Sequence, residues 1–285
     1  MLFKGRRQSS NVEDQRGKSG SRLLNFKGGI IGAIVVGVIV YFMGGDPLQV
    51  LNLMNTGGTD TATETVELSD HEREMTEFVS VVLADTEDVW HAIFEQQGMT
   101  YREPKLVLFR GSVNSACGFA DAATGPFYCS GDEKVYLDLQ FLEQLQQKLG
   151  AEGDFAVAYI IAHEVGHHVQ NLMGIMDKVN EVRGNSSEAE QNEMTVKMEL
   201  QADFLAGVWV HHAQKTKQFL ESGDLDEALN AATAVGDDQI QMNTRGYVTP
   251  DSFTHGTSAQ RKNWLKRGIQ SGDLSEGDTF HSENL

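Results

Sequence analysis

The sequence contains a His-Glu-x-x-His pattern formed by His163, Glu164 and His167. In a helix, residues four apart lie on one face, about 6 Å apart along the axis. Two histidines in this arrangement can bind one zinc ion (Zn²⁺) at about 2.0–2.1 Å each. Glu164 then projects beside the metal and can take a proton from a zinc-bound water, whose pKa zinc lowers towards ~7. The pattern therefore predicts hydrolysis by attack of an activated water on a carbonyl group.

The residues around this pattern bear on whether it is a chance match. A His-Glu-x-x-His pattern arises at random in on the order of one chain in a hundred of this histidine content, and a helix with two surface histidines is the alternative. The residues at 158–162 (AYIIA) directly precede the pattern and are apolar, which indicates a buried helix. Burying these polar side chains without a partner would be costly. A bound metal removes that cost, so we expect a metal site.

A second acidic pair lies downstream, in the segment MELQADFLAG at 198–207. A catalytic zinc needs a third protein ligand and one open position. Glu199 and Asp203 are four apart and share a helical face. We expect Glu199 to bind zinc and Asp203 to accept the free N–H of a ligating histidine, which orients its ring. The alternative places Glu199 in solvent on an amphipathic helix. His168 points about 100° away from His167, so it is left out of the site.

The elements that position these residues have mostly helical patterns. The spacing Ser69-x-x-Glu72 is a capping box and starts one helix. Two short strand-like runs follow, at 106–109 and 135–139. The fold class we predict is α+β and mainly helical, with a small mixed sheet over the active-site helix and the Glu199 helix beside it. Further helices are expected at roughly 141–149, 154–172, 188–218, 225–234 and 258–270.

The strand at 135–139 has two interpretations. It contains Tyr136 and reads VYLDL. An exposed sheet edge can pair with an extended peptide, which would make this strand a substrate-binding edge. It is equally well explained as an inner strand of the core sheet.

The charge is strongly acidic but unevenly distributed. The 285 residues contain 41 Asp and Glu against 23 Lys and Arg, for a net charge of −18. A nucleic-acid-binding protein needs a basic face to neutralise phosphates, so this class is excluded. Residues 1–27, however, hold seven basic and two acidic side chains. We therefore expect residues 1–27 and the rest of the chain to lie in different surroundings.

A run of 17 uncharged residues, GGIIGAIVVGVIVYFMG at 28–44, follows the basic end. About 17 is the lower limit for a bilayer-spanning helix, and we expect an uncleaved transmembrane anchor. A cleaved signal peptide is the rival, but its apolar region would be shorter, about 7–15 residues, and an A-x-A-like site should follow. A buried core helix is a further alternative. The basic flank puts the N-terminus in the cytoplasm and the bulk of the chain on the other side.

These features divide the chain into five parts. They are a flexible basic cytoplasmic tail (1–27), a transmembrane anchor (28–44), a linker (45–68), a catalytic domain (69–270) and a loosely ordered C-terminal tail (271–285). The expected localisation is a single-pass protein of the bacterial inner membrane with a periplasmic catalytic domain.

The two cysteines, Cys117 and Cys129, lie between the strand-like runs in a loop rich in Gly and Ala. In a domain outside the cytoplasm a disulfide is the first expectation. It would close a loop of 13 residues and stabilise the fold by about 3 kcal/mol in the chain-entropy model. The alternative is two buried free thiols. No second Cys or His pair lies nearby in the sequence, so a zinc site built on both cysteines is not expected.

The sequence resembles the putative neutral zinc metallopeptidases of the YpfJ-like group in bacteria. The resemblance covers nearly the whole chain. The matching segments are GRRQSSNVEDQRG at 5–17, the run at 28–44, PKLVLFRG at 104–111, the loop of Cys117 and Cys129, IAHEVGHHVQ, MELQADFLAGVW and PDSFTHGTSAQR at 250–261. More distantly, Glu199-x-x-Ala-Asp203 and the block from Thr254 to Arg261 resemble the membrane-linked gluzincins that include the CAAX-processing and HtpX-type proteases.

The resemblance implies a zincin-like fold and roles for individual residues. It implies zinc ligands, a base and a supporting carboxylate at His163, His167, Glu199, Glu164 and Asp203. A zinc peptidase also needs a donor to the developing oxyanion, and in the gluzincins a downstream His or Arg is suitably placed. His255 or Arg261 is the candidate here. The alternative is that THGTS at 254–258 only caps a helix, with Thr257 or Ser258 as N-cap.

Two functions from different classes follow. The first is a membrane-anchored, zinc-dependent endopeptidase whose partners are a protein or peptide substrate and the lipid bilayer at 28–44. The second is a non-catalytic, zinc-stabilised interaction or adaptor protein on a protease-like scaffold. Glu164 favours the first, because a binding module does not need a general base. A third interpretation, a cytoplasmic protein with a core helix at 28–44, predicts reduced thiols at Cys117 and Cys129. Neither the specificity nor the oligomeric state follows from the sequence.

Overall fold

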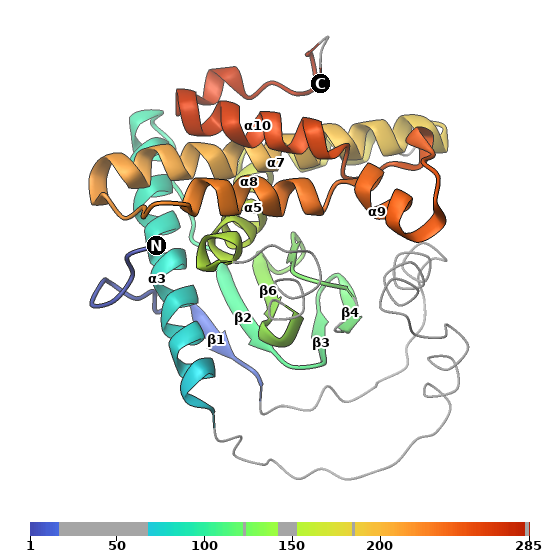
Figure 1. Ribbon diagram of the computed structural model, residues 1–285. Coiled ribbons are helices and arrows are strands. Elements are labelled where there is room, and N and C mark those ends of the chain that lie inside the picture. The colour runs from blue at the N-terminus through green and yellow to red at the C-terminus, as the bar shows by residue number, and fades with distance from the viewer. Residues whose placement is uncertain (17–67, 122–123, 142–152, 184–185, 283–284) are drawn as a thin grey trace, which may run out of the picture.

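The computed structural model describes residues 1–16, 68–121, 124–141, 153–183, 186–282 and 285 (Figure 1). Helices predominate over strands, as predicted for a mainly helical α+β fold. The strands are β1 (Val12–Asp14), β2 (Lys105–Phe109), β3 (Ser112–Ser115), β4 (Gly118–Asp121), β5 (Phe127–Cys129) and β6 (Lys134–Asp138). The helices are α3 (Asp70–Gln96), α5 (Asp154–Leu172), α6 (Ile175–Arg183), α7 (Glu188–Lys217), α8 (Asp224–Ala234), α9 (Asp237–Arg245) and α10 (Ser258–Ser271), with short 3₁₀ turns η1 (Pro250–Ser252) and η2 (Leu274–Glu276).

The main sheet is mixed and has the order β1-β2-β6-β5. The strands β1, β2 and β6 run parallel to one another, and β5 is antiparallel to β6. Strand β6 is the run predicted at 135–139, and it lies between β2 and β5. It is therefore an inner strand, and the interpretation of Tyr136 as part of a substrate-binding edge is wrong. Among the described strands, β5 forms the edge of the main sheet next to β6.

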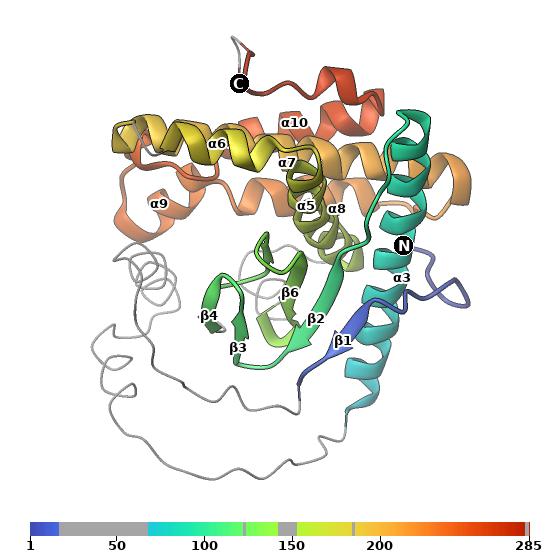
Figure 2. The same ribbon diagram turned by 180° about the vertical axis from the view of Figure 1, so that it is seen from behind.

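A layer of helices covers the sheet and holds most of the core. Figures 1 and 2 show α5, α7, α8 and α10 gathered above the strands, with α3 alongside β1. Helix α5 is apolar over most of its circumference and is buried from Phe155 to Gln170 except at Ile160, as expected for a helix inside a domain. Phe155 stacks on Trp209 of α7 and lies against Phe219. These aromatic contacts fix the start of α5 against α7.

Residues 1–16 form part of the domain, which corrects the prediction of a flexible tail at 1–27. Strand β1 pairs with β2, and the Leu106 N–H donates to the Asn11 carbonyl at 2.9 Å. Arg6 pairs with Asp85 of α3 at 2.8 Å. The tail was predicted from its polar, basic composition, but Arg6 and Arg7 pair with carboxylates on α3 and its backbone adds a strand to the sheet. Residues 17–67 lie outside the described residues.

The membrane segment predicted at 28–44 therefore lies outside the described residues as well. Within the part of the chain that the structure describes, no helix combines the length and apolar character needed to cross a membrane.

The C-terminal segment is also ordered, contrary to the expected loose tail at 271–285. Thr279 is fully buried, and its hydroxyl donates to the Lys197 carbonyl of α7 at 2.6 Å. The Gln201 side chain of α7 donates to the Gly277 carbonyl at 2.9 Å. These hydrogen bonds hold the segment against α7, and Leu274 also packs against the hydrophobic core.

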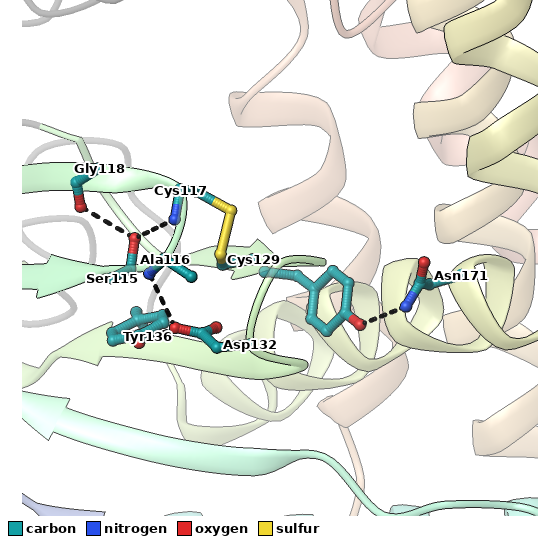
Figure 3. Close-up of a disulfide and its surroundings, with 9 residues drawn as sticks. Ser115, Ala116, Cys117, Gly118, Cys129, Asp132, Tyr136 and Asn171 are labelled. Carbon is teal, nitrogen blue, oxygen red and sulfur yellow. Dashed lines mark hydrogen bonds between the residues drawn. A yellow bond between two sulfur atoms is a disulfide. The ribbon is translucent and has the colours of Figure 1, made fainter. Parts of the chain in front are cut away.

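A disulfide joins Cys117 and Cys129, as expected for this pair (Figure 3). It attaches the β3–β4 hairpin to β5 at the edge of the main sheet. The Ala116 N–H donates to Asp132 at 3.0 Å, next to the disulfide (Figure 3). On the other side of β5, Asn171 of α5 donates to the Tyr128 hydroxyl at 3.1 Å. The disulfide and these bonds connect the hairpin, the sheet edge and α5.

Candidate active site

Helix α5 places His163, Glu164 and His167 together in the interior. The side chains of His163 and His167 are only 9% and 10% exposed, and their ring centres lie 4.8 Å apart. The preceding turns of α5 are packed on all sides, so this part of the helix is held rigidly. Glu164 is also buried. The spacing of four thus brings the two imidazoles to one place.

Helix α7 supplies Glu199 between the two imidazoles. It begins at a capping box formed by Ser187 and Glu190, which satisfies free N–H groups at its start. One oxygen of Glu199 lies 3.1 Å from His163 Nε2, and the other lies 3.5 Å from His167 Nε2. Tetrahedral ligands at 2.0–2.2 Å from zinc are separated by about 3.3–3.6 Å. The three residues therefore fit the ligand set of one zinc ion.

Gly166 permits this close approach of α5 and α7. A Cβ atom at this position would lie 3.0 Å from the Ala202 carbonyl oxygen of α7. A side chain at this position would therefore require a shift of a few tenths of an ångström between α5 and α7, the helix that carries Glu199. The glycine between the two histidines of the pattern thus has a packing role where α5 meets α7.

Asp203 lies behind His163. Its carboxylate accepts a hydrogen bond from His163 Nδ1 at 2.8 Å, so the ring nitrogen that faces Glu199 is Nε2. Asp203 also accepts from the Tyr159 hydroxyl at 2.5 Å and from Arg261 Nε at 2.8 Å. The structure therefore places Asp203 where it was expected, next to a candidate metal ligand.

The carboxylates remain charged in this interior. Burial would raise the pKa of Asp203, but Arg261 and His163 outweigh it and lower the pKa to about 2. Burial likewise opposes the charge on Glu199, and the adjacent His167 and His163 hold its pKa well below the usual range. The pKa of His163 shifts the other way: burial lowers it, but Asp203 and Glu199 raise it to about 10. The site thus strongly favours positive charge between these side chains.

His255 and Arg261 have different positions, which the sequence did not distinguish. Arg261 is buried and its guanidinium is bound to Asp203, although it is also close enough to Glu199 for an electrostatic interaction. The side chain of His255 is 49% exposed and close enough to Glu199 for an electrostatic interaction. Its loop is held by Asp237, whose Oδ2 accepts the N–H of His255 at 2.6 Å. Thr257 caps α10, so the cap and an exposed His255 occur together.

Three residues near the site were not identified from the sequence. Gln170 accepts a hydrogen bond from His167, Tyr159 contacts Asp203, and Asp237 holds the loop of His255. The available signals were weak: Gln170 and Tyr159 are polar residues within one turn of a histidine on an apolar helix. His168, which was left out, lies elsewhere, between the Tyr128 hydroxyl and the Arg102 carbonyl.

The fold and the site together define a class. A buried helix with His-Glu-x-x-His, a glutamate from a second helix and a carboxylate behind one histidine form the arrangement of a zinc metallopeptidase. The chain matches the family described as putative neutral zinc metallopeptidase over residues 1–280 and belongs to this family.

Its relatives are found in different bacteria. The uncharacterized protein YpfJ of Escherichia coli strain K12 is 49% identical over 288 residues, which cover 98% of this chain and 99% of that protein. An uncharacterized protein of Mycobacterium tuberculosis strain H37Rv is 42% identical over 195 residues, 65% of each chain. No solved structure matches the chain.

Proposed function

We propose that this protein is a zinc-dependent endopeptidase, with His163, His167 and Glu199 holding the metal. The observation that carries the proposal is the convergence of these three side chains beside Glu164 on the buried face of α5. When bound, zinc would polarise a peptide carbonyl and acidify a water molecule. The family supports a peptidase in general, and protein or peptide is the substrate class that this chemistry implies.

Glu164 is the proposed general base. Its carboxylate forms no hydrogen bond or ion pair with any of the described residues, although it lies next to two histidines that each have polar partners. A carboxylate free of partners can accept a proton from the attacking water and deliver it to the leaving amine. This freedom distinguishes Glu164 from Glu199 and Asp203, which are both engaged.

His255 is the proposed donor to the oxygen of the carbonyl under attack. It lies near Glu199, has its ring half exposed, and its loop is held in place by Asp237. A fixed donor at this position would stabilise the developing negative charge. Arg261 is excluded from this role because it is buried against Asp203.

The test compares the wild type with Glu164→Gln on an unstructured protein substrate, with zinc content measured for both. Loss of a general base should lower the rate by about 10²–10⁴-fold, while zinc remains bound. Glu181→Gln, an exposed change on α6, is the control and should cleave like the wild type. Equal cleavage by all three proteins that resists chelators would contradict the proposal. Bound zinc with no cleavage of any substrate would favour the adaptor function.

We also infer that the domain works outside the cytoplasm, at a membrane contacted by residues 28–44. The support is the disulfide between Cys117 and Cys129, since disulfides persist in oxidising compartments, and the uncharged run at 28–44. Alkylation mapping of cells quenched with acid tests this. Cys117 and Cys129 should be protected from the reagent until a reductant is added. Free thiols at both positions would indicate a cytoplasmic domain.

A further inference from the structure

Gln170 makes three hydrogen bonds in the interior of the site. It is fully buried and follows His167 by three residues on α5. Its Oε1 lies 2.9 Å from His167 Nδ1. Its Nε2 lies 2.8 Å from the Met198 carbonyl and 3.0 Å from Gln201 Oε1, both on α7. The amide thus connects a candidate zinc ligand to the helix that carries Glu199.

The direction of these bonds is determined by backbone carbonyls. The Met198 carbonyl can only accept, so it requires the NH₂ group of Gln170. Gln201 donates its own NH₂ group to the Gly277 carbonyl at 2.9 Å, so its oxygen faces Gln170. Both neighbours on α7 therefore need donors, and the NH₂ group of Gln170 supplies both of them. The remaining oxygen of Gln170 can only accept, and it faces His167.

The direction of the Gln170 amide determines which ring nitrogen of His167 carries a proton. Because Gln170 presents an oxygen, His167 Nδ1 must carry the proton and donate. A neutral imidazole has one N–H, so the lone pair is then on Nε2, the atom that faces Glu199. In the neutral form that zinc binding requires, His163 has the same tautomer, because its Nδ1–H donates to the charged carboxylate of Asp203.

We propose that Gln170 is the positioning residue of His167: it fixes the tautomer and ring orientation needed for zinc binding, and its own direction is fixed by the carbonyls of Met198 and Gly277. The inference rests on the proposed zinc site. One ligand is thus supported by a charge and the other by a neutral amide, so the site gains no further buried negative charge. Gly277 lies in the C-terminal segment, which therefore contributes to the metal site through Gln201.

The test measures zinc affinity by competition with a chromophoric chelator, a readout that does not depend on catalysis. Gln170→Met keeps the length of the side chain but removes its hydrogen bonds, and zinc binding should weaken about 10–100-fold. Gln170→Glu keeps an acceptor for His167 but repels the Met198 carbonyl and Gln201, and it should also weaken binding. Gln214→Met is the control, because this half-buried glutamine bonds the Leu220 N–H at the far end of α7. Its zinc affinity should equal that of the wild type.

A second measurement needs no variant. In the zinc-loaded wild type, nitrogen NMR should find the proton of His167 on Nδ1 and exchanging slowly. A proton on Nε2 would overturn the proposal, as would a zinc affinity within twofold of the wild type for Gln170→Met. If zinc affinity falls as expected but Glu164→Gln cleaves like the wild type, the positioning role stands and the proposed peptidase mechanism fails.

Discussion

Asp203 is the residue on which most of the buried polar network depends. It is fully buried and accepts hydrogen bonds from His163, Tyr159 and Arg261. Breaking a buried ion pair by removing one partner is strongly destabilising, because the other charge stays in the interior without compensation. Asp203 thus has two roles: it orients a candidate zinc ligand and it neutralises the buried guanidinium of Arg261.

We predict that Asp203→Asn will lower both zinc affinity and stability. The neutral side chain orients His163 less firmly, so zinc should bind about 10–100-fold more weakly. Arg261 is left buried without its counter-charge, which should cost about 3–5 kcal/mol of unfolding free energy. Urea unfolding of the zinc-free protein and chelator competition measure the two effects. Adding Arg261→Met should restore part of the stability but not the zinc affinity. A loss below about 1 kcal/mol, the size of an ordinary substitution, would contradict the role of Arg261.

At the level of the helices, three glycines allow α7 to pack closely against α5 and α10. Gly166 lies against Ala202 where α5 meets α7. Where α10 meets α7, a Cβ atom at Gly207 would lie 2.3 Å from the Leu265 carbonyl oxygen, and one at Gly268 would lie 2.1 Å from the Phe204 carbonyl oxygen. Helix α10 carries Arg261 and α7 carries Asp203, so these close contacts bring the buried ion pair together.

Gly207→Ala tests this packing, because close packing and helix propensity predict opposite changes in stability. In an exposed helix, replacing Gly by Ala stabilises by about 1 kcal/mol. Here the added methyl group meets backbone rather than a flexible side chain, so the helices must separate, and we expect a loss of about 1–3 kcal/mol. Thermal and urea unfolding measure it. A more stable Gly207→Ala protein would show that α7 and α10 have room to adjust.

For the whole molecule, the pairing of β1 with β2 determines where the N-terminal residues lie. Strand β1 forms backbone hydrogen bonds within the sheet, and Arg6 and Arg7 pair with Asp85 and Glu87 of α3. None of these bonds can form across a hydrocarbon core about 30 Å thick. We therefore expect residues 1–16 and the catalytic domain to lie on the same side of any membrane. A single crossing at 28–44 with a cytoplasmic N-terminus does not fit this sheet.

Labelling of intact cells with a membrane-impermeant thiol reagent tests this arrangement. We predict equal labelling of Ser10→Cys, in the N-terminal segment, and of Ser222→Cys, in the domain between α7 and α8. Both positions are exposed, so the second variant is a matched control for access. Labelling of Ser222→Cys alone would place the two segments on opposite sides, as the sequence first indicated. It would also mean that β1 does not pair with β2 in the cell.

The basic N-terminal residues illustrate how tertiary contacts can give a charged segment a second role. Their charge was interpreted as a topology signal beside an apolar run. In the folded chain several of them instead neutralise acidic side chains of α3, as Arg6 does with Asp85. The sequence shows only that opposite charges exist some 70 to 80 positions apart. Local spacing rules do not apply at this separation.

The sequence alone determined the features that depend on local backbone geometry. A spacing of four places His163 beside His167 and Glu199 beside Asp203, because the helical repeat brings such residues to one face. Capping boxes and apolar periodicity similarly located the start of α3, and both ends of α5, α7 and α10, to within a residue or two. The choice of Arg261 as partner of Asp203, the direction of the Gln170 amide, the inner position of β6 and the docking of β1 were decided by the tertiary structure. Each depends on which groups meet across tens of residues once the core is packed, and that contact leaves no pattern in the neighbouring sequence.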